Sequence, residues 1–125
     1  MTTKILIVDD SKLARMSVAK MLSGLRPEWT RMEAANAEEA LVQTAKARPD
    51  IILLDFNMPG QSGLELAAQL RVTQPQIPVA IVSANIQIEI VERAAQTGAT
   101  FLPKPLTEAA LAGFLDAAEA QLAAR

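Results

Sequence analysis

The sequence contains neither cysteine nor histidine among its 125 residues. Without cysteine the chain has no disulfide and no thiolate that binds zinc or acts as a nucleophile, which fits a reducing compartment. Without histidine it lacks the commonest general base and the commonest metal ligand. Any phosphorylated histidine in its chemistry must therefore belong to a partner protein.

Long apolar runs and an excess of positive charge are also missing. The apolar run at residues 5–8 stops at Asp9 and Asp10, and no run approaches the roughly 18 residues of a membrane-spanning helix. The formal net charge is -2, so no basic field is available to neutralise a phosphate backbone. We therefore expect a cytoplasmic protein that is neither exported nor embedded in a membrane and that does not bind nucleic acid.

Length and apolar content predict a single domain. Half of the 125 residues are apolar, which suits one compact domain with one core. Short apolar runs alternate with longer amphipathic stretches, the rhythm of a repeating β/α architecture. The last predicted helix runs almost to Arg125, so we expect residues 1–125 to form one domain without an effector domain.

The pattern predicts five strands and five helices. The strands lie near residues 4–9, 30–34, 50–55, 78–83 and 100–103, and the helices near 11–24, 37–47, 62–74, 86–97 and 106–124. Asn36 followed by Glu39 predicts a helix N-terminus closed by a capping box. Gly98 predicts a helix C-terminus.

The polarity of the strands predicts their order. Residues 5–8, 51–54 and 79–82 are apolar throughout, as central strands covered on both faces by helices should be. The fifth strand contains Pro103, which favours an edge, and the second strand is short and mixed in polarity. Right-handed crossovers then favour the order 2-1-3-4-5, an α/β fold with a flavodoxin-like doubly wound parallel sheet and helices on both faces.

Polar side chains follow the strands at the edge where sheets of this kind bind ligands. Asp9 and Asp10 follow the first strand, Asp55 the third, Ser83 the fourth and Lys104 the fifth. Carboxylates about 4 Å apart repel one another by about 4 kcal/mol at an effective dielectric constant near 20, so they recruit a cation or take up protons. Oxygen ligands without His or Cys suit Mg²⁺ in the company of a phosphate. The edge is therefore predicted to perform phosphoryl chemistry.

Each of these residues also has a simpler structural interpretation. An acidic pair favours a helix N-terminus whatever its function, and Asp55 suits the polar end of a strand before a turn. Ser83 suits a turn or a helix cap, and Lys104 a solvated surface charge. Their combination favours function, because a nucleophile, cation ligands, a hydroxyl and an ammonium group together meet the needs of phosphoryl transfer.

Four short motifs contain these residues. They are Asp9-Asp10, Asp55-Phe56-Asn57-Met58-Pro59-Gly60-Gln61-Ser62-Gly63, Ser83-Ala84 and Phe101-Leu102-Pro103-Lys104-Pro105. In order and spacing they resemble the receiver domain of two-component response regulators, and the resemblance covers essentially the whole chain. The signature of that family has an acidic pair, an Asp before x-x-Met-Pro-x-x-x-Gly, a Ser or Thr before Ala, and Lys-Pro. No signature residue is missing, which implies a phosphorylated rather than a degenerate receiver.

The resemblance implies how the acceptor and the metal ligands work. Asp55 would attack a phosphohistidine on a sensor histidine kinase and become an acyl phosphate. Asp10, Asp55 and the main-chain carbonyl of Asn57 would bind Mg²⁺ or Mn²⁺, with Asp9 helping through water. The chain would then be no enzyme in the usual sense, because it would catalyse only its own phosphorylation and dephosphorylation.

The same resemblance implies a switch. Lys104 would pair with the phosphoryl oxygens, Ser83 would move to hydrogen-bond one of them, and Phe101 would swing inward. Lys104-Pro105 resembles the cis peptide bond of the family. One hydroxyl bond, worth roughly 1.5 to 3 kcal/mol to a charged group, is smaller than the ~5.5 kcal/mol that moves a population from about 1 to 99 per cent. We therefore expect partial switching until a partner binds.

The expected output face comprises the predicted helix 86–97, strand 100–103 and helix 106–124. Through it a monomer or weak dimer would bind a downstream target or a phosphotransfer protein. In helix 86–97 the spacing predicts a core stripe of Ile86, Ile90, Val91 and Ala94. Ile88 points elsewhere and is a candidate anchor for a partner, although single exposed isoleucines are commonplace.

Several functions stay open at this point. As a receiver, the chain would be either a chemotaxis-like regulator that binds a target when phosphorylated or a phosphorelay intermediate that passes its phosphoryl group to a histidine phosphotransfer protein. A small Mg²⁺-dependent phosphatase of the haloacid dehalogenase type would need Asp two residues after its nucleophile, where this chain has Asn57. A flavodoxin-like electron carrier would not suit the acidic turn Asp9-Asp10-Ser11, and with no Tyr and one Trp the flavin-stacking aromatics are scarce.

Overall fold

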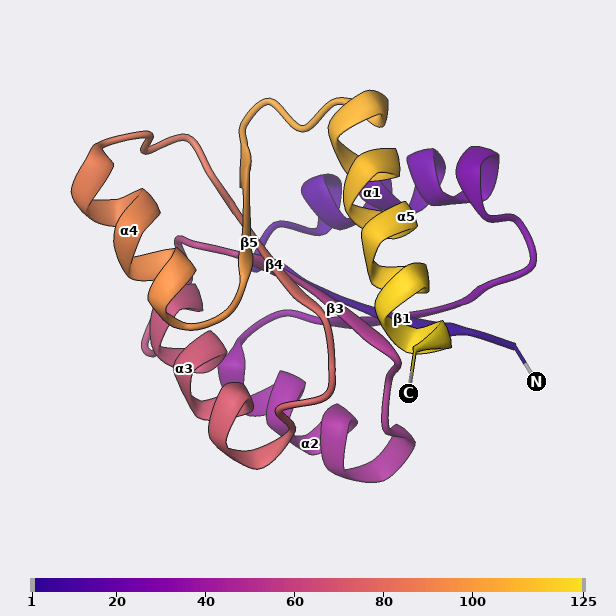
Figure 1. Cartoon of the computed structure of the whole chain (residues 1–125), viewed down its shortest axis with the longest axis horizontal. Coiled ribbons are helices and arrows are strands. Elements are labelled where there is room, and N and C mark those ends of the chain that lie inside the picture. Colours follow the sequence, from indigo (N-terminus) through magenta and orange to yellow (C-terminus); the bar gives the residue numbers. More distant parts are fainter. Residues whose placement is uncertain (1, 125) are drawn as a thin grey trace.

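Five parallel strands form one sheet in the order β2-β1-β3-β4-β5 in the computed structural model, which describes residues 2–124 (Figure 1). The strands are β1 (Lys4–Val8), β2 (Thr30–Ala34), β3 (Ile51–Asp55), β4 (Val79–Ser83) and β5 (Thr100–Pro103). The helices are α1 (Lys12–Leu25), α2 (Ala37–Ala47), α3 (Gly63–Thr73), α4 (Ile88–Gln96) and α5 (Glu108–Ala123). The predicted flavodoxin-like fold and its strand order are confirmed.

Successive residues of each strand point to opposite faces of the sheet, so the sheet has two apolar layers. Figure 1 shows α1 and α5 on one side of the sheet and α2 and α3 on the other. Leu6 and Leu54 pack on the side of α2, α3 and α4, whereas Ile7 and Leu53 pack on the side of α1 and α5. All five residues of β3 are buried, as the apolar run predicts for a central strand.

The layer beneath α1 and α5 contains the single tryptophan of the chain. Trp29 lies directly before β2 and is buried in this layer. The guanidinium carbon of Arg26 lies 5.5 Å from the centre of the Trp29 ring. Arg26 Nη2 also reaches Asp116 Oδ1 at 2.6 Å and Glu119 Oε1 at 2.7 Å, both on α5. This group of contacts ties the end of α1 to α5.

The predicted helix ends are present. The Glu39 main-chain N–H donates to Asn36 Oδ1 at 2.8 Å, and Glu39 Oε1 accepts from the Ala35 N–H at 3.2 Å, which forms a reciprocal cap for α2. Gly98 follows the end of α4 with a φ of 82°, a conformation that glycine adopts without a Cβ penalty. The peptide bond between Lys104 and Pro105 is cis.

The helix α4 begins two residues later than predicted, and one residue of its predicted core stripe, Ile86, is not in the core. Ile86 is 69% exposed and precedes the helix, which begins at Ile88. The loop is closed instead by Asn85 Oδ1, which accepts from the Gln87 N–H at 3.1 Å. Of the other stripe residues Ala94 is buried and Ile90 is half-buried. The remaining element bounds differ from the predicted ones by at most two residues.

Within residues 2–124, none of the helices combines the length and the apolar character needed to cross a membrane.

Candidate functional site

An acidic cluster lies at the carboxyl edge of the sheet. Asp55 is the last residue of β3, and Asp9 and Asp10 follow directly after β1, the strand next to β3. One carboxylate oxygen of each residue lies within 4.8 Å of those of the other two. Asp55 is 5% exposed and Asp9 9% exposed, whereas Asp10 is open to solvent. The sequence prediction that these three side chains meet is therefore correct as geometry.

Lys104 lies directly against the buried carboxylate of Asp55. Its Nζ is 2.6 Å from Asp55 Oδ1, and the lysine side chain is 37% exposed against 5% for the aspartate. This oxygen has no hydrogen-bond donor among residues 2–124, so Lys104 is its ion-pair partner. An ion pair depends far less on angle than a hydrogen bond does, so the short distance by itself makes this contact attractive. The Asp55 carboxylate is therefore held beside a positive charge.

Main-chain and side-chain contacts hold Asp9 at three points. Its N–H donates to the Ala34 carbonyl at 3.1 Å, its Oδ1 accepts from the Ser11 N–H at 2.9 Å, and its carbonyl accepts from Arg15 Nη1 at 2.7 Å. Burial raises the pKa of Asp9, and the Ser11 N–H opposes this rise. The negative charges of Asp55 and Asp10 raise the pKa further, whereas Lys104 lowers it.

The donor set of the cluster fits a small divalent cation. Three carboxylates face one ammonium group, so the cluster carries excess negative charge at neutral pH. Every ligand offered is an oxygen, and a buried carboxylate oxygen lacks a hydrogen-bond donor. Mg²⁺ prefers one or two carboxylates, completes its shell with water and phosphate oxygens, and does not require His or Cys. The residues present therefore fit the magnesium that the sequence predicts.

Ser83 lies on β4, the strand next to that of Asp55, and Phe101 lies on β5, one strand further out. Ser83 ends β4 and is 1% exposed, and its carbonyl accepts from the Lys104 N–H at 2.9 Å. Its Oγ accepts from the Asn85 N–H at 3.0 Å, so the hydroxyl proton is free to donate elsewhere. Phe101 lies on β5 opposite Ile81 and is half-buried. Asn57 is exposed, two residues beyond Asp55 in the loop before α3.

A cavity of about 520 Å³ adjoins this cluster. It lies between α1 and the loop from β5 to α5, and its walls are mainly apolar. Small residues of α1, Ala14 and Ser17, face Pro105 and Leu106 across it, with Asp9, Asp55 and Lys104 at its border. Apolar walls lower the effective dielectric constant, which strengthens the attraction between Lys104 and Asp55. The sequence analysis did not predict this cavity.

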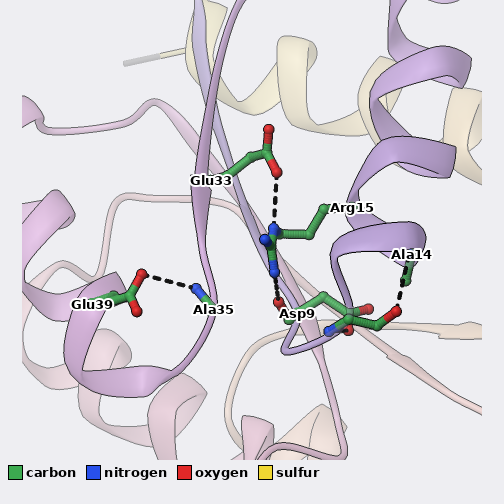
Figure 2. A network of polar contacts seen from close by, with 7 residues as sticks. Asp9, Ala14, Arg15, Glu33, Ala35 and Glu39 are labelled. Carbon is green, nitrogen blue, oxygen red and sulfur yellow. Dashed lines mark hydrogen bonds and ion pairs between the residues drawn. The ribbon is translucent and has the colours of Figure 1, made fainter.

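Arg15 and Glu33 are further residues that the sequence analysis missed. Arg15 Nε lies 2.8 Å from Glu33 Oε1 and joins α1 to β2, as Figure 2 shows. The two residues are 18 positions apart, and opposite charges at that separation are common and give no periodic signal. The folded topology brings them together beside the end of β1.

Comparison with known proteins gives a consistent result. Residues 5–116 match the family model described as "Response regulator receiver domain". The chain is 33% identical over 106 residues to Sporulation initiation phosphotransferase F of Bacillus subtilis, a match that covers 84% of each chain. It is 36% identical over 100 residues to the DNA-binding transcriptional regulator NtrC of Salmonella typhimurium, a match that covers 79% of this chain and 21% of that protein.

Solved structures agree with these sequence relatives. The chemotaxis protein CheY4 of Vibrio cholerae superposes with a TM-score of 0.84 at 30% identity, over 94% of this chain and 99% of that one. The chain spans between about a fifth and a half of the first curated relatives that it matches, with 21% of NtrC and 47% of the transcriptional activator protein ExaE of Pseudomonas putida. The activities of those whole proteins therefore do not transfer directly.

Proposed function

This chain belongs to the response regulator receiver domain family of two-component signalling, and from that premise we propose that it is a phosphorylation switch whose acceptor is Asp55. The 125 residues would act as a single receiver domain that takes the phosphoryl group from a sensor histidine kinase. The observation that carries the proposal is the buried Asp55 carboxylate, which lies in an acidic cluster and against the ammonium group of Lys104. Receiver domains in general interact with histidine kinases and downstream effectors.

The acidic cluster would bind the metal ion. Receiver domains generally bind Mg²⁺ through an acidic pocket, and here Asp9, Asp10, Asp55 and the main-chain carbonyl of Asn57 would hold Mg²⁺ or Mn²⁺. When bound, the ion would supply positive charge for the phosphoryl oxygens and for the carboxylates that crowd one another. Asp10 is exposed and is therefore free to turn toward the ion, whereas Asp9 is fixed by its three contacts.

The transfer itself would be a substitution at phosphorus. An oxygen of the Asp55 carboxylate forms a bond to phosphorus, and the phosphorus–nitrogen bond to the histidine of the kinase breaks. The imidazole leaves with the electron pair of that bond, and Asp55 becomes an acyl phosphate. Lys104 lies 2.6 Å from Asp55 Oδ1 and is placed to pair with the phosphoryl oxygens as the new bond forms. A second substitution would restore Asp55: water attacks the phosphorus, the phosphorus–oxygen bond to the Asp55 carboxylate breaks, and inorganic phosphate leaves. The chain would thus act only on itself.

The switch would run from Ser83 into the start of α4. The Ser83 Oγ accepts from the Asn85 N–H, and Asn85 Oδ1 accepts from the Gln87 N–H, the residue directly before α4. A Ser83 hydroxyl that moves to bond a phosphoryl oxygen would change this chain of contacts, and Phe101 would turn inward. A phosphoryl group shifts the equilibrium only by the difference in its contacts between the two states.

Phosphorylation would be read out at the face formed by α4, β5 and α5. Ile88 is 75% exposed at the first position of α4 and offers an apolar anchor for a partner protein. The protein would act there as a monomer or weak dimer. A second output, transfer of the group to a histidine phosphotransfer protein, is favoured by the likeness to a relative named as a phosphotransferase that covers 84% of both chains.

Intact mass after incubation with acetyl phosphate and Mg²⁺ tests the acceptor. We expect one adduct of about 80 daltons, lost in Asp55→Asn and in excess EDTA, because the acceptor oxygen or the metal is then removed. Asp116→Asn is the matched control, since Asp116 lies on α5 and pairs with Arg26. An adduct that persists in Asp55→Asn, or no adduct in the native chain, would refute the assignment of Asp55.

A further inference from the structure

Arg15 connects three elements behind the acidic cluster. Its Nε donates to Glu33 Oε1 on β2 at 2.8 Å, and its Nη1 donates to the carbonyl of Asp9 at the end of β1 at 2.7 Å (Figure 2). The arginine itself belongs to α1, and its side chain is only 15% exposed. This guanidinium therefore lies between the edge strand and the turn that carries the acidic pair.

The contact with the Asp9 carbonyl fixes more than Asp9. The carbonyl of Asp9 and the N–H of Asp10 belong to one planar peptide unit. A donor that holds this oxygen therefore also sets the plane from which the Asp10 side chain leaves the chain. Asp10 is exposed, so little packing from other residues restrains its direction.

The geometry uses the particular shape of arginine. Two nitrogens of one rigid guanidinium donate to two acceptors, one on β2 and one directly after β1, and Glu33 holds the group in place. A lysine ammonium is a compact point charge on a flexible stem, and it does not reproduce this fixed fork. The 18-residue separation of Arg15 and Glu33 means that the link also makes the turn after β1 depend on the position of β2.

We propose that Arg15 is a positioning residue of the metal site, which orients the peptide between Asp9 and Asp10 so that both carboxylates face the cation. This inference rests on the proposed binding of Mg²⁺ by the acidic cluster. Residues that orient metal ligands typically contribute ten- to a hundredfold to metal affinity. Arg15 touches neither the metal nor the phosphoryl group and acts only through the main chain of Asp9.

The sign of the effect separates this role from simple charge repulsion. Arg15 is a cation near a site for a cation, so its removal would strengthen Mg²⁺ binding if only its charge mattered. If it orients the ligands, its removal weakens Mg²⁺ binding. The two explanations therefore predict opposite changes in one measurable constant.

The test is the Mg²⁺ dissociation constant, measured by calorimetric titration of the unphosphorylated chain. We expect about tenfold weaker binding in Arg15→Met, nearly as large a loss in Arg15→Lys, and a two- to threefold loss in Glu33→Gln, where the arginine keeps its contact with Asp9. Arg31→Met is the matched control, because Arg31 is an exposed arginine on the same strand as Glu33. The Mg²⁺ affinity of this variant should equal that of the native chain.

Melting curves in EDTA show whether each variant folds. If Arg15→Met does not fold, the comparison uses Arg15→Lys. Binding by Arg15→Met or Arg15→Lys that is as tight as in the native chain, or tighter, would overturn the positioning role. Absence of Mg²⁺ binding in the native chain would instead refute the proposed function, so the two failures are distinguishable.

Discussion

Gly63 leaves no room for a side chain beside the main chain of Asp55. It is the first residue of α3, and a Cβ at this position would collide with the main-chain carbonyl oxygen of Asp55. The same atom would lie 3.0 Å from Phe56 Cα, and the Gly63 N–H already donates to the Phe56 carbonyl at 3.0 Å. Glycine therefore allows α3 to begin directly against the end of β3.

Alanine at this position is expected to weaken both the fold and the site. Gly63→Ala should lower the free energy of unfolding by about 1 to 3 kcal/mol, since the main chain of Asp55 has to move. Phosphorylation of Asp55 should slow with it. The matched control is Gly113→Ala in α5, where the added methyl meets open space and should raise the free energy of unfolding by about 0.5 to 1 kcal/mol.

Denaturant titration measures both free energies of unfolding, and intact mass over time measures the phosphorylation rate. The explanation fails if both variants change stability in the same direction, because the collision at Asp55 is then not what distinguishes the two glycines.

At the scale of single residues, the positions of side chains that belong to a sequence motif could be predicted. The positions of side chains that are defined only by a contact in the fold could not. Asp55, Lys104 and the pair Asp9-Asp10 follow apolar strands, so their meeting at one edge follows from the topology. The contact of Arg15 with the Asp9 carbonyl leaves no trace in the sequence, because its acceptor is a main-chain atom that every residue has.

The helices differ in how their first turns are closed. Side chains of Ser11, Asn36, Ser62 and Thr107 accept from main-chain N–H groups at the starts of α1, α2, α3 and α5. At α4 the corresponding residue is Gln87, whose side chain makes no such hydrogen bond. The first turn of α4 is therefore held less firmly than the others, at the element that the switch is proposed to move.

A residue that caps α4 should make its first turn more stable. Serine at position 87 is among the preferred capping residues, so Gln87→Ser should stabilise α4 by about 0.5 to 1 kcal/mol. Amide hydrogen exchange in the first two turns of α4 should slow by about two- to fivefold, if these amides exchange by local opening. Gln87→Ala is the control, because alanine does not cap and should leave exchange unchanged. Equal exchange in the serine and alanine variants would show that the missing cap does not limit this helix.

The same helix marks the limit of prediction from periodicity. Ile86 and Ile90 are four positions apart, so the pattern extends the apolar stripe one turn too far. The chain of contacts from Ser83 through Asn85 to Gln87 competes with helix formation, and it leaves Ile86 exposed. In α2 the cap residues lie within the sequence pattern itself, so the start of that helix was predicted correctly.

At the scale of the molecule, the acidic cluster affects stability. Burial raises the pKa of Asp9 above its ordinary value of 3.8, as do the nearby Asp55 and Asp10 charges. The folded state thus holds the carboxyl proton of Asp9 more tightly than the unfolded state does. Protonated Asp9 therefore contributes stability at a pH below its ordinary pKa, and this contribution is lost as the pH rises through the raised pKa. At a pH above the raised pKa and without a metal, the ionised Asp9 therefore weakens the fold.

Removal of this charge should therefore stabilise the metal-free chain. We expect Asp9→Asn to raise the melting temperature in EDTA at pH 7 by about 2 to 5 °C, and the gain should shrink as the pH falls through the raised pKa of Asp9. Mg²⁺ should then raise the melting temperature less in Asp9→Asn than in the native chain, because stabilisation by a ligand grows with its affinity.

Scanning calorimetry in EDTA and in excess Mg²⁺ provides both comparisons. Glu92→Gln removes a carboxylate from the exposed side of α4 and serves as the control, with no change expected in either condition. A lower melting temperature for Asp9→Asn in EDTA would mean that its contacts outweigh the charge repulsion.

The strand order of the sheet could be predicted from the sequence, whereas the cavity beside Lys104 could not. Three wholly apolar runs and a proline in the last strand were enough to order the sheet, because few connections satisfy the handedness of parallel crossovers. The cavity beside Lys104 depends on how Ala14 and Ser17 fit against Pro105 and Leu106. Packing between residues so far apart in the chain is a property of the assembled fold.

The position of Trp29 determines what its fluorescence can report. It lies just before β2, at the amino edge of the sheet, while the acidic cluster occupies the carboxyl edge. A strand of five residues spans roughly 17 Å, so the indole is remote from the acidic cluster and from Asp55. Buried beneath Arg26, its fluorescence reports the integrity of the layer under α1 and α5. The emission of the native chain thus offers a readout of unfolding that chemistry at Asp55 leaves largely undisturbed.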